Sequence, residues 1–408
     1  MATIKPFKAL RPRPEFAKAL SCVPYDTLTK AESRQYVAEN PLSFLRVTKP
    51  KADFPKGEVP PWPEVVEHAK ANLQKFIDDG ILERDAEDAI YVYRLSRDDH
   101  SQTGIVACLS IDEYEQGVIK KHENVRPEKV NERAAHIVGL RAQTGLIFLA
   151  FRSTTETQRL ITEASAADPL YDYIAPDGVR QQVWRVSDSG PFVDAFRDVP
   201  SIYIADGHHR LEGARIARQE LRSQDADPRP DAEYNFVMAG IFPADELRIL
   251  PYNRAVRDLN GVSVDEFLER CAEHFVVADT DSATPTENGE ILVYVGNTWY
   301  DLRFKADHMA DRDPVDDLDV SILQNYLLGP VLGITDPTTS DRIEFISGAC
   351  GTTELERLVD KGEAAAAFSL FATSMDDLLT VSDMGEIMPP KSTWFEPKLK
   401  DGLLVHEI

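Results

Sequence analysis

Apolar residues recur with a helical period in several stretches of the chain. In Glu64–Gly80 they fall on one helical face, and Gly80 is a typical stop signal. Pro127 predicts a second helix start, because its missing N–H is not needed in the first turn. Thr353 and Glu356 have the spacing of a capping box. The remaining predicted helices are Leu211–Leu221, Val264–His274, Val320–Leu332 and Glu354–Phe368.

Short runs rich in β-branched and aromatic residues predict strands between these helices. Ala89–Arg97 and Thr103–Ile111 have the pattern of two paired strands, and Gly145–Phe151 that of a buried one. The other predicted strands are Gln182–Val186, Ser201–Ala205, Asn235–Phe242, Arg248–Pro251, and a hairpin of Ile291–Val295 with Trp299–Phe304. The mixture of elements predicts an α+β (mixed α/β) fold with mixed sheets.

Charge divides the chain into two parts. The 408 residues contain 69 Asp and Glu against 45 Lys and Arg, a formal charge of −24. Residues 1–255 sum to −5 and residues 256–408 to −19, which suggests a boundary near Tyr252–Val262. We therefore expect a domain of residues 1–255 and a smaller, acidic α/β domain of residues 256–408. The Asp-rich Ala306–Asp319 is a second candidate linker, and Ser223–Glu233 is predicted to be a surface loop.

Composition also excludes several functions. No apolar run of about 18 residues is present, so no membrane-spanning helix is expected, and the first residues lack an apolar signal core. The four cysteines are far apart, which favours a reduced cytoplasmic location. The negative charge argues against nucleic acids and anionic membranes as partners. The sequence does not determine the oligomeric state.

The most specific motif is Asp206-Gly207-His208-His209-Arg210. A β-rich run ends there and a helix begins, so backbone N–H groups and a partial positive charge are expected at the turn. Basic side chains oppose the helix dipole, which favours an anion as ligand. A solvated β-turn-α junction is the alternative. Adjacent side chains on a helix point about 100° apart, so His208 and His209 form a poor metal pair.

A second candidate is the charged loop Lys120–Pro127, which contains His122 and Glu123. Neighbouring cations would keep Glu123 ionised, as a general base requires. A solvated loop in which Glu123 forms ion pairs explains the same residues.

Two Pro-bounded loops are further candidates for the lining of a pocket. The first contains Tyr25 and Asp26, although Tyr25 capping a core explains it too. The second contains Lys391, Ser392 and Thr393, which could bind an anion, although a Pro-rich segment wrapping a core explains it equally. Walker A, dinucleotide-binding, nucleophile-elbow and His-Glu-Xaa-Xaa-His patterns are absent from the sequence.

The order of these motifs resembles domain-of-unknown-function family 1015 over nearly the whole chain. The segments that carry the resemblance are 5–12, 23–26, 40–45, 122–124, 205–210, 250–252 and 389–398. The family is similar to the archaeal ADP-dependent free-serine kinase, which implies a ParB/sulfiredoxin-like nucleotide-binding fold. His208 stands where sulfiredoxins have a reactive cysteine, and the acidic second half differs from the DNA-binding part of ParB proteins. Sulfinic-acid reduction and DNA partitioning are therefore disfavoured.

The resemblance and the motifs together lead to a functional hypothesis. We expect a nucleotide-dependent phosphotransferase, a kinase for a small hydroxylated and perhaps serine-like metabolite, that uses ADP or ATP with Mg²⁺. The alternatives are a nucleotide-binding regulatory module without catalysis and a metal-dependent hydrolase that uses His122, His208 and His209. The assigned residues are Glu123 (base), His122 and Asp206 (catalytic), Asp206 (metal), Gly207, His208, His209 and Arg210 (nucleotide), and Tyr25, Asp26, Lys391, Ser392 and Thr393 (substrate).

Overall fold

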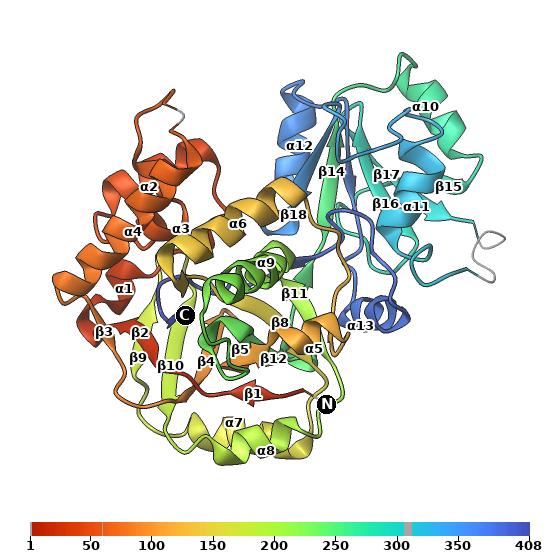
Figure 1. Cartoon of the computed structure of the whole chain (residues 1–408). Coiled ribbons are helices and arrows are strands. Elements are labelled where there is room, and N and C mark those ends of the chain that lie inside the picture. Colours follow the sequence, from red (N-terminus) through yellow and green to blue (C-terminus); the bar gives the residue numbers. More distant parts are fainter. Residues whose placement is uncertain (1, 59, 306–311) are drawn as a thin grey trace. The chain divides into compact units, whose positions relative to one another are not determined.

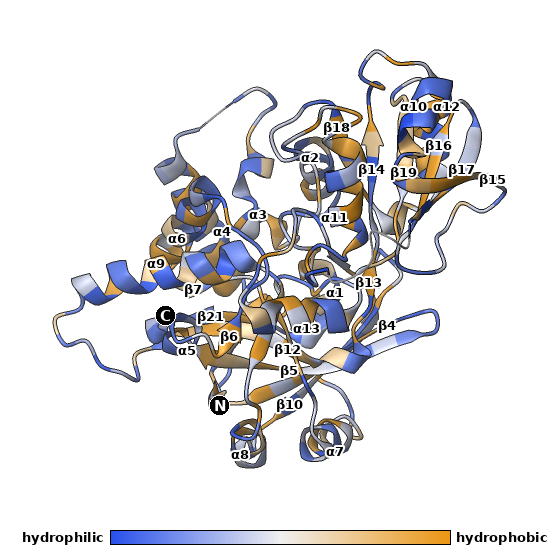
Figure 2. Ribbon diagram, turned by 90° about the vertical axis from the view of Figure 1, so that its right-hand side faces the viewer, coloured by the Kyte–Doolittle hydropathy of each residue, from blue (hydrophilic) through white to orange (hydrophobic). Residues whose placement is uncertain are grey.

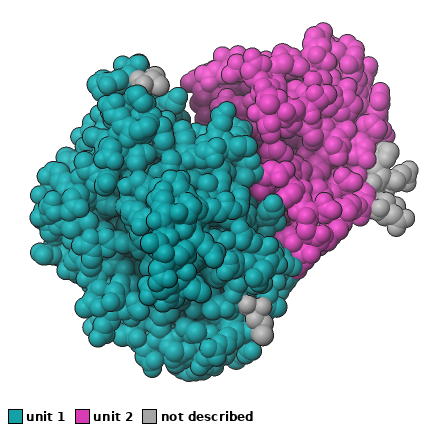
Figure 3. Space-filling model, viewed as in Figure 1, with its two compact units in different colours: residues 1–121, 125–247, 397–408 teal, residues 122–124, 248–396 magenta. Residues whose placement is uncertain are grey.

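The chain forms two compact units, coloured separately in Figure 3. The computed structural model describes residues 2–58, 60–305 and 312–408. Unit 1 consists of residues 1–121, 125–247 and 397–408, and unit 2 of residues 122–124 and 248–396. The end of the chain therefore belongs to the same unit as its beginning. The predicted domains of residues 1–255 and 256–408 stay a prediction, because independent folding of either segment is untested.

Unit 1 is built on a nine-stranded mixed sheet with the order β6-β11-β8-β12-β5-β4-β10-β9, and β1 pairs with β5 beside this path. The β11–β6 and β12–β8 pairs are parallel and the other pairs are antiparallel. The strands are β1 Ile4–Lys5, β4 Ile90–Arg97, β5 His100–Ser110, β6 Ile119–Lys120, β8 Ile147–Phe151, β9 Tyr171–Ile174, β10 Arg180–Val186, β11 Ile202–Asp206 and β12 Phe236–Pro243.

Helices cover both sides of this sheet, which explains why its central strands are apolar on both faces. Figures 1 and 2 show α7 and α8 on one side, and α6 and α9 on the other. Apolar residues of all four helices join the strands in one buried core. The α-helices of unit 1 are α1 Ala17–Leu20, α2 Lys30–Glu39, α3 Leu45–Thr48, α4 Trp62–Asp78, α5 Ile111–Glu115, α6 Pro127–Leu140, α7 Thr155–Ala164, α8 Gly190–Phe196 and α9 His208–Gln224.

A second sheet of unit 1 joins distant parts of the chain. Its order is β3-β2-β21-β7, so the C-terminal strand lies between two strands from the first half of the sequence. Its strands are β2 Ala9–Pro12, β3 Leu82–Arg84, β7 Ala142–Gln143 and β21 Val405–Glu407. Residues of β2, β21, α3 and α4 share a separate apolar cluster, so residues 397–408 are part of the core of unit 1.

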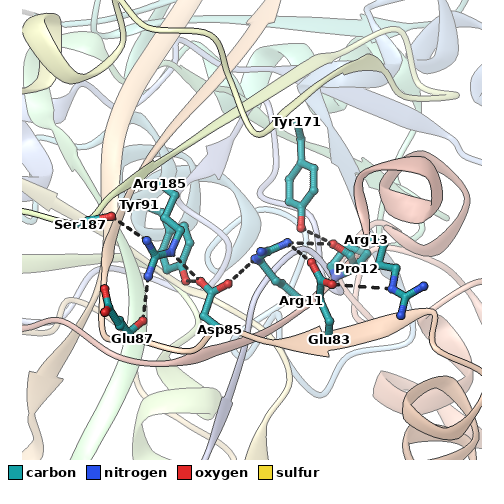
Figure 4. Close-up of polar contacts among 10 residues, drawn as sticks. All are labelled: Arg11, Pro12, Arg13, Glu83, Asp85, Glu87, Tyr91, Tyr171, Arg185 and Ser187. Atoms are coloured by element: carbon teal, nitrogen blue, oxygen red, sulfur yellow. Dashed lines mark hydrogen bonds and ion pairs between the residues drawn. The ribbon is translucent and has the colours of Figure 1, made fainter.

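Asp85 links β2 of the second sheet to β10 of the large sheet through ion pairs with Arg11 and Arg185 (Figure 4). Its carboxylate accepts a hydrogen bond of 2.7 Å from Arg11 Nε and one of 3.0 Å from Arg185 Nε. The hydroxyl of Tyr91 donates a third bond to the same carboxylate. The Asp85 side chain is only 4% exposed, so these three donors replace the water that an ionised carboxylate requires.

Unit 2 contains a six-stranded antiparallel sheet with the order β15-β17-β16-β19-β14-β18, and a separate β13–β20 pair. Its strands are β13 Ile249–Leu250, β14 Tyr252–Val256, β15 Phe275–Thr280, β16 Glu290–Val295, β17 Thr298–Phe304, β18 Ile343–Ser347, β19 Ala366–Ser369 and β20 Trp394–Phe395. Its α-helices are α10 Val264–Cys271, α11 Asp319–Leu323, α12 Thr353–Asp360 and α13 Met375–Met384.

Most predicted elements are confirmed. The helices after Glu64 and at Pro127, the pairing of β4 with β5, the hairpin of β16 and β17, and the exposed loop after α9 all occur near their expected positions. The mixed α/β fold class is therefore confirmed. No helix in the described part of the chain has the length and apolar character needed to cross a membrane.

The helix predicted over Glu354–Phe368 is wrong in its second half. It ends at Asp360, Gly362 has a positive φ, and Ala366–Ser369 forms β19 between β14 and β16. The spacing of this small apolar run fits a helix face, but the run is fully buried as a central strand with partners on both sides. The capping box is also wrong, because the N-cap is Thr352 and its side chain makes no cap bond.

One more prediction from the second half needs correction. The apolar Val320–Leu332 forms only the short α11 and a wider π-helical turn, Gln324–Leu328, which ends before Gly329 and Pro330. Tyr252–Val256, part of the expected boundary, is the buried strand β14. Of the predicted Asp-rich linker, residues 306–311 lie outside the described residues, and Asp319 is buried at the start of α11.

Candidate functional site

The connection between β11 and α9 is a tight turn at Gly207. Gly207 is the N-cap of the 17-residue α9, and its φ of +102° lies in the left-handed region that favours glycine. A Cβ at this position would lie 3.1 Å from Arg210 Nε. The N-cap offers no side-chain acceptor to the first turn of α9, so the positive end of the helix faces the turn without a capping side chain.

Arg210 folds back over Gly207 and is nearly buried, with 10% of its side chain exposed. Its Nη1 donates a hydrogen bond to the carbonyl of Leu146. Its Nε has no hydrogen-bond partner among the described residues. Burial alone would lower the pKa of Arg210, but the carboxylates of Asp26, Asp206 and Asp401 raise it above its ordinary value. The guanidinium is therefore a permanent buried positive charge.

Asp206 lies between two cations. One carboxylate oxygen accepts a 2.7 Å bond from Lys398 Nζ, and the other is 3.7 Å from Arg210 Nη2. Burial opposes ionisation, yet Lys398 and then Arg210 hold the pKa of Asp206 below its ordinary value. Burial likewise lowers the pKa of Lys398, but Asp206 raises it above the usual value. Asp206 is thus an ionised carboxylate that positions Lys398 beside the turn.

Lys398 is a site residue that sequence reasoning missed. In the Pro-rich segment that ends at Lys398, the sequence pattern points to Lys391, Ser392 and Thr393. Asp206 and Lys398 are 192 positions apart, so spacing gives no signal for this ion pair. The available signal was Lys398 itself, the last residue of the segment that carries the family resemblance.

The two histidines of the turn have different environments. His208 is 4% exposed, whereas His209 is half-buried and its Nε2 accepts a 3.0 Å hydrogen bond from the backbone N–H of Arg126. In the large sheet, Lys120 pairs with Tyr203 of β11. Both ends of the charged loop predicted at Lys120–Pro127 are therefore held beside β11 and the first turn of α9.

The middle of that loop belongs to unit 2. His122, Glu123 and Asn124 group with residues 248–396, and the backbone N–H of Met388 donates a 2.9 Å hydrogen bond to the carbonyl of His122. Glu123 is half-buried and lies three positions along the chain from both Lys120 and Arg126. Its predicted role as the base stays a prediction.

Of the predicted substrate residues, Tyr25 lies in unit 1 near Arg210. Tyr25 lines a cavity, and the guanidinium of Arg133 is 4.1 Å from the centre of its ring. Burial raises the pKa of Tyr25 to about 12, so its hydroxyl is neutral. Asp26 is exposed and contributes negative charge near Arg210. The cavity is lined by Tyr25, Thr48, Arg133, His136, Ile137, Gln143, Thr144, Gly145, Ile147, Arg210, Ala214, Val237 and Asp401.

Lys391, Ser392 and Thr393 form a braced loop in unit 2. Arg254 is 3% exposed and donates to the carbonyls of Pro390 and Lys391. Ser392 Oγ donates a 2.6 Å bond to the Pro389 carbonyl, and Lys391 has a φ of +60°. The ammonium of Lys391 is 5.5 Å from the centre of the Tyr252 ring. A substrate-binding role for this loop stays a prediction.

A protein-built metal centre receives no support within residues 2–58, 60–305 and 312–408. No group of three or more His, Cys, Asp or Glu side chains lies close enough there to hold a metal ion. Within those residues, His122, His208 and His209 therefore do not form such a group.

Residues 4–321 match the family described as "Protein of unknown function (DUF1015)". The chain belongs to the DUF1015 family. The match confirms the resemblance predicted from its motifs, and it includes the turn at Gly207 and the loop at Glu123. No curated protein matches this DUF1015 chain.

Several solved structures are similar to the chain at low identity. A free serine kinase in complex with AMP is 15% identical, with a TM-score of 0.37, and the alignment covers 73% of this chain and 91% of the kinase. A conserved hypothetical protein from Pyrococcus furiosus is 16% identical, with a TM-score of 0.37 and coverages of 74% and 95%. SbnI with a C-terminal truncation, from Staphylococcus aureus, is 12% identical, with a TM-score of 0.40 and coverages of 74% and 87%.

Proposed function

We propose that this DUF1015 protein is a nucleotide-dependent phosphotransferase that acts on a small hydroxylated metabolite. The observation that carries the proposal is the first turn of α9, where the positive end of a 17-residue helix meets the buried, cationic Arg210. Helix starts of this kind bind phosphate groups through backbone N–H groups and the helix dipole. Part of unit 1 is then a ParB/sulfiredoxin-like nucleotide-binding fold, with ADP or ATP as the phosphoryl donor.

The chain offers a residue for each step of the transfer. Gly207, His208 and His209 bind the phosphates at the turn, and Lys398, oriented by Asp206, adds a second positive charge. Glu123 accepts the proton of the metabolite hydroxyl as its oxygen attacks the terminal phosphorus, and the bond from that phosphorus to the nucleotide breaks. Catalysis then rests mainly on positioning and on stabilisation of charge.

Magnesium fits the turn less well than phosphate does. Asp206 is the carboxylate that the sequence suggested as its ligand, but both of its oxygens face cations, Lys398 at 2.7 Å and Arg210 at 3.7 Å. A divalent cation at Asp206 would have to displace Lys398.

The replacement Glu123→Gln tests the transfer step. Loss of a general base slows transfer by about 10²- to 10⁴-fold, while nucleotide affinity, which depends on the turn, is expected to stay unchanged. The measurement is phosphorylated product formed from ADP or ATP and a pool of hydroxylated metabolites, with nucleotide affinity measured in parallel by thermal shift. Glu128→Gln is the matched control, because Glu128 is exposed in the first turn of α6 and is expected to leave both readouts unchanged.

Two results would contradict this proposal. If the protein does not bind nucleotides, the turn at Gly207 does not bind nucleotide phosphates and the proposal is wrong. Nucleotide binding without turnover, together with indifference to Glu123→Gln, would show instead a regulatory nucleotide-binding module.

A further inference from the structure

Three buried polar atoms in unit 1 have no hydrogen-bond partner among the described residues, and their side chains line one cavity. They are Arg210 Nε, Asp401 Oδ2 and Thr48 Oγ1. Thr48 and Asp401 are each 2% exposed, and the Arg210 side chain is 10% exposed. An unpartnered buried polar group costs about 1–3 kcal/mol, so three around one cavity point to a polar ligand.

The charges around the cavity favour an anion. Arg210 contributes one guanidinium, and the half-buried Arg133 contributes a second, which donates a 3.3 Å bond from Nη1 to the Thr48 carbonyl. Asp401 is the one acidic residue in the described lining. Burial lowers the pKa of His136 to about 3, so this histidine is neutral. The wall is therefore net positive whether Asp401 is ionised or protonated.

The size of the cavity limits the ligand to a small group. Its volume is about 30 Å³. This is the volume open to the centre of a water-sized sphere, of which one water molecule needs roughly 10–15 Å³. The cavity therefore accepts about two oxygen-sized groups. A carboxylate has two oxygens, whereas a phosphate has up to four. Ile137, Ile147, Ala214 and Val237 provide apolar surface for the carbon attached to such a group.

We propose that this cavity binds the carboxylate group of a small metabolite. The Nε–H of Arg210, the hydroxyl of Thr48 and the O–H of protonated Asp401 act as its donors. If the protein is the phosphotransferase proposed above, its acceptor is a hydroxylated carboxylic acid, an identification that rests on the proposed function. The binding itself does not require phosphoryl transfer.

Protonation of Asp401 gives this site a pH dependence. Burial raises the pKa of Asp401 to about 7, and Asp26 adds to the rise, while Arg210, Arg133 and the nearby hydroxyl of Thr48 act in the opposite direction. Cys22 and Tyr93 are also close enough for electrostatic interaction: burial raises the pKa of both groups, and the carboxylate of Asp401 raises it further. Because the proposed carboxylate requires the O–H of Asp401, its affinity should fall about tenfold for each pH unit above the pKa.

Calorimetric titration of the full-length protein with acetate and glycolate tests the proposal, with acetamide as the uncharged control. We expect acetate and glycolate to bind more tightly at pH 6 than at pH 8 by about tenfold, and acetamide not to bind. Thr48→Val keeps the shape of the side chain but removes a donor, and should weaken acetate about tenfold. Thr103→Val, whose hydroxyl accepts a bond from Arg94 elsewhere in unit 1, should have no effect.

Asp401→Asn separates the charge of this group from its hydrogen bonding. The amide of asparagine is a permanent donor, so acetate should still bind but without the dependence on pH. Unchanged acetate affinity in Thr48→Val, or binding of inorganic phosphate in place of acetate, would overturn the proposal. These outcomes do not depend on an activity assay, so failure of phosphoryl transfer and failure of the cavity assignment are distinguishable.

Discussion

At the scale of single residues, buried carboxylates in unit 1 differ in what surrounds them. Asp85 is surrounded by donors from Arg11, Arg185 and Tyr91. Burial favours its neutral form, but the Tyr91 bond and the arginines lower its pKa below the ordinary value. Asp401 is equally buried, has an unpartnered oxygen among the described residues, and has a raised pKa. The first arrangement stabilises the fold, and the second suits a ligand.

Asp85→Asn is expected to lower the free energy of unfolding by about 3 kcal/mol at neutral pH. The reason is that two largely buried guanidinium groups would lose their counter-charge. Denaturant unfolding of both proteins measures the difference. Asp172→Asn, which breaks the exposed Arg180 pair, is the control, with an expected loss below about 1 kcal/mol.

The pH dependence of this difference has a definite sign. Since the folded-state pKa of Asp85 is lowered, its contribution is fully present above the unfolded-state pKa of about 3.9 and is lost as pH falls through the folded-state value. The stability difference between the natural protein and Asp85→Asn should therefore shrink at acid pH. A difference that stayed constant down to about pH 2 would contradict this assignment.

At the scale of elements, the β11–α9 junction depends on the absence of a side chain at Gly207. Gly207→Ala adds a Cβ that would lie 3.1 Å from Arg210 Nε and 3.3 Å from Cζ, so the guanidinium must move. We expect a loss of stability of about 1 kcal/mol from the left-handed φ and roughly tenfold weaker nucleotide binding. Unfolding and nucleotide titration measure the two effects separately.

Gly178 is the matched control for this prediction. Its φ of +82° is also left-handed, but a Cβ there meets no described atom within 4 Å. Gly178→Ala should therefore cause a similar loss of stability and leave nucleotide binding unchanged. Equal nucleotide affinities in the two variants would show that the position of Arg210 does not matter for binding.

At the scale of the whole molecule, the segment 397–408 completes unit 1. It contributes Lys398 to the turn, Asp401 to the cavity, and β21 to the sheet between β2 and β7. Leu399, Leu403, Leu404 and Val405 are each at most 4% exposed. Burial of one such side chain contributes about 1.5–3 kcal/mol, so the four together match the usual stability of a domain.

Deleting residues 397–408 is therefore expected to prevent stable folding of unit 1. The measurement is the yield of soluble protein and its thermal unfolding transition. Leu404→Ala is the milder comparison, with an expected loss of about 2–5 kcal/mol and a retained cooperative transition. A deletion variant with an unchanged transition would show that these residues are dispensable for folding.

How far the sequence predicts the fold depends on the range of the interactions involved. The spacing of apolar residues and the positions of glycine and proline predicted α4, α6, the hairpin of β16 and β17, and the turn at Gly207, because neighbouring residues determine each of them. The same reasoning assigned Ala366–Phe368 to a helix, because short apolar runs have no distinctive period. The partners on either side of β19 come from β14 and β16, which no local pattern reveals.

For the candidate site, the sequence by itself determined the family, the mixed α/β class, and a cationic helix start that follows a glycine. These follow from residues adjacent in the chain. Only the tertiary structure showed that Arg210 folds inward, that Lys398 pairs with Asp206, and that Thr48 and Asp401 line a cavity with Arg210. Those relations join segments up to 353 positions apart, from Thr48 to Asp401. Burial and the close approach of charges, which set their chemistry, exist only once the chain has folded.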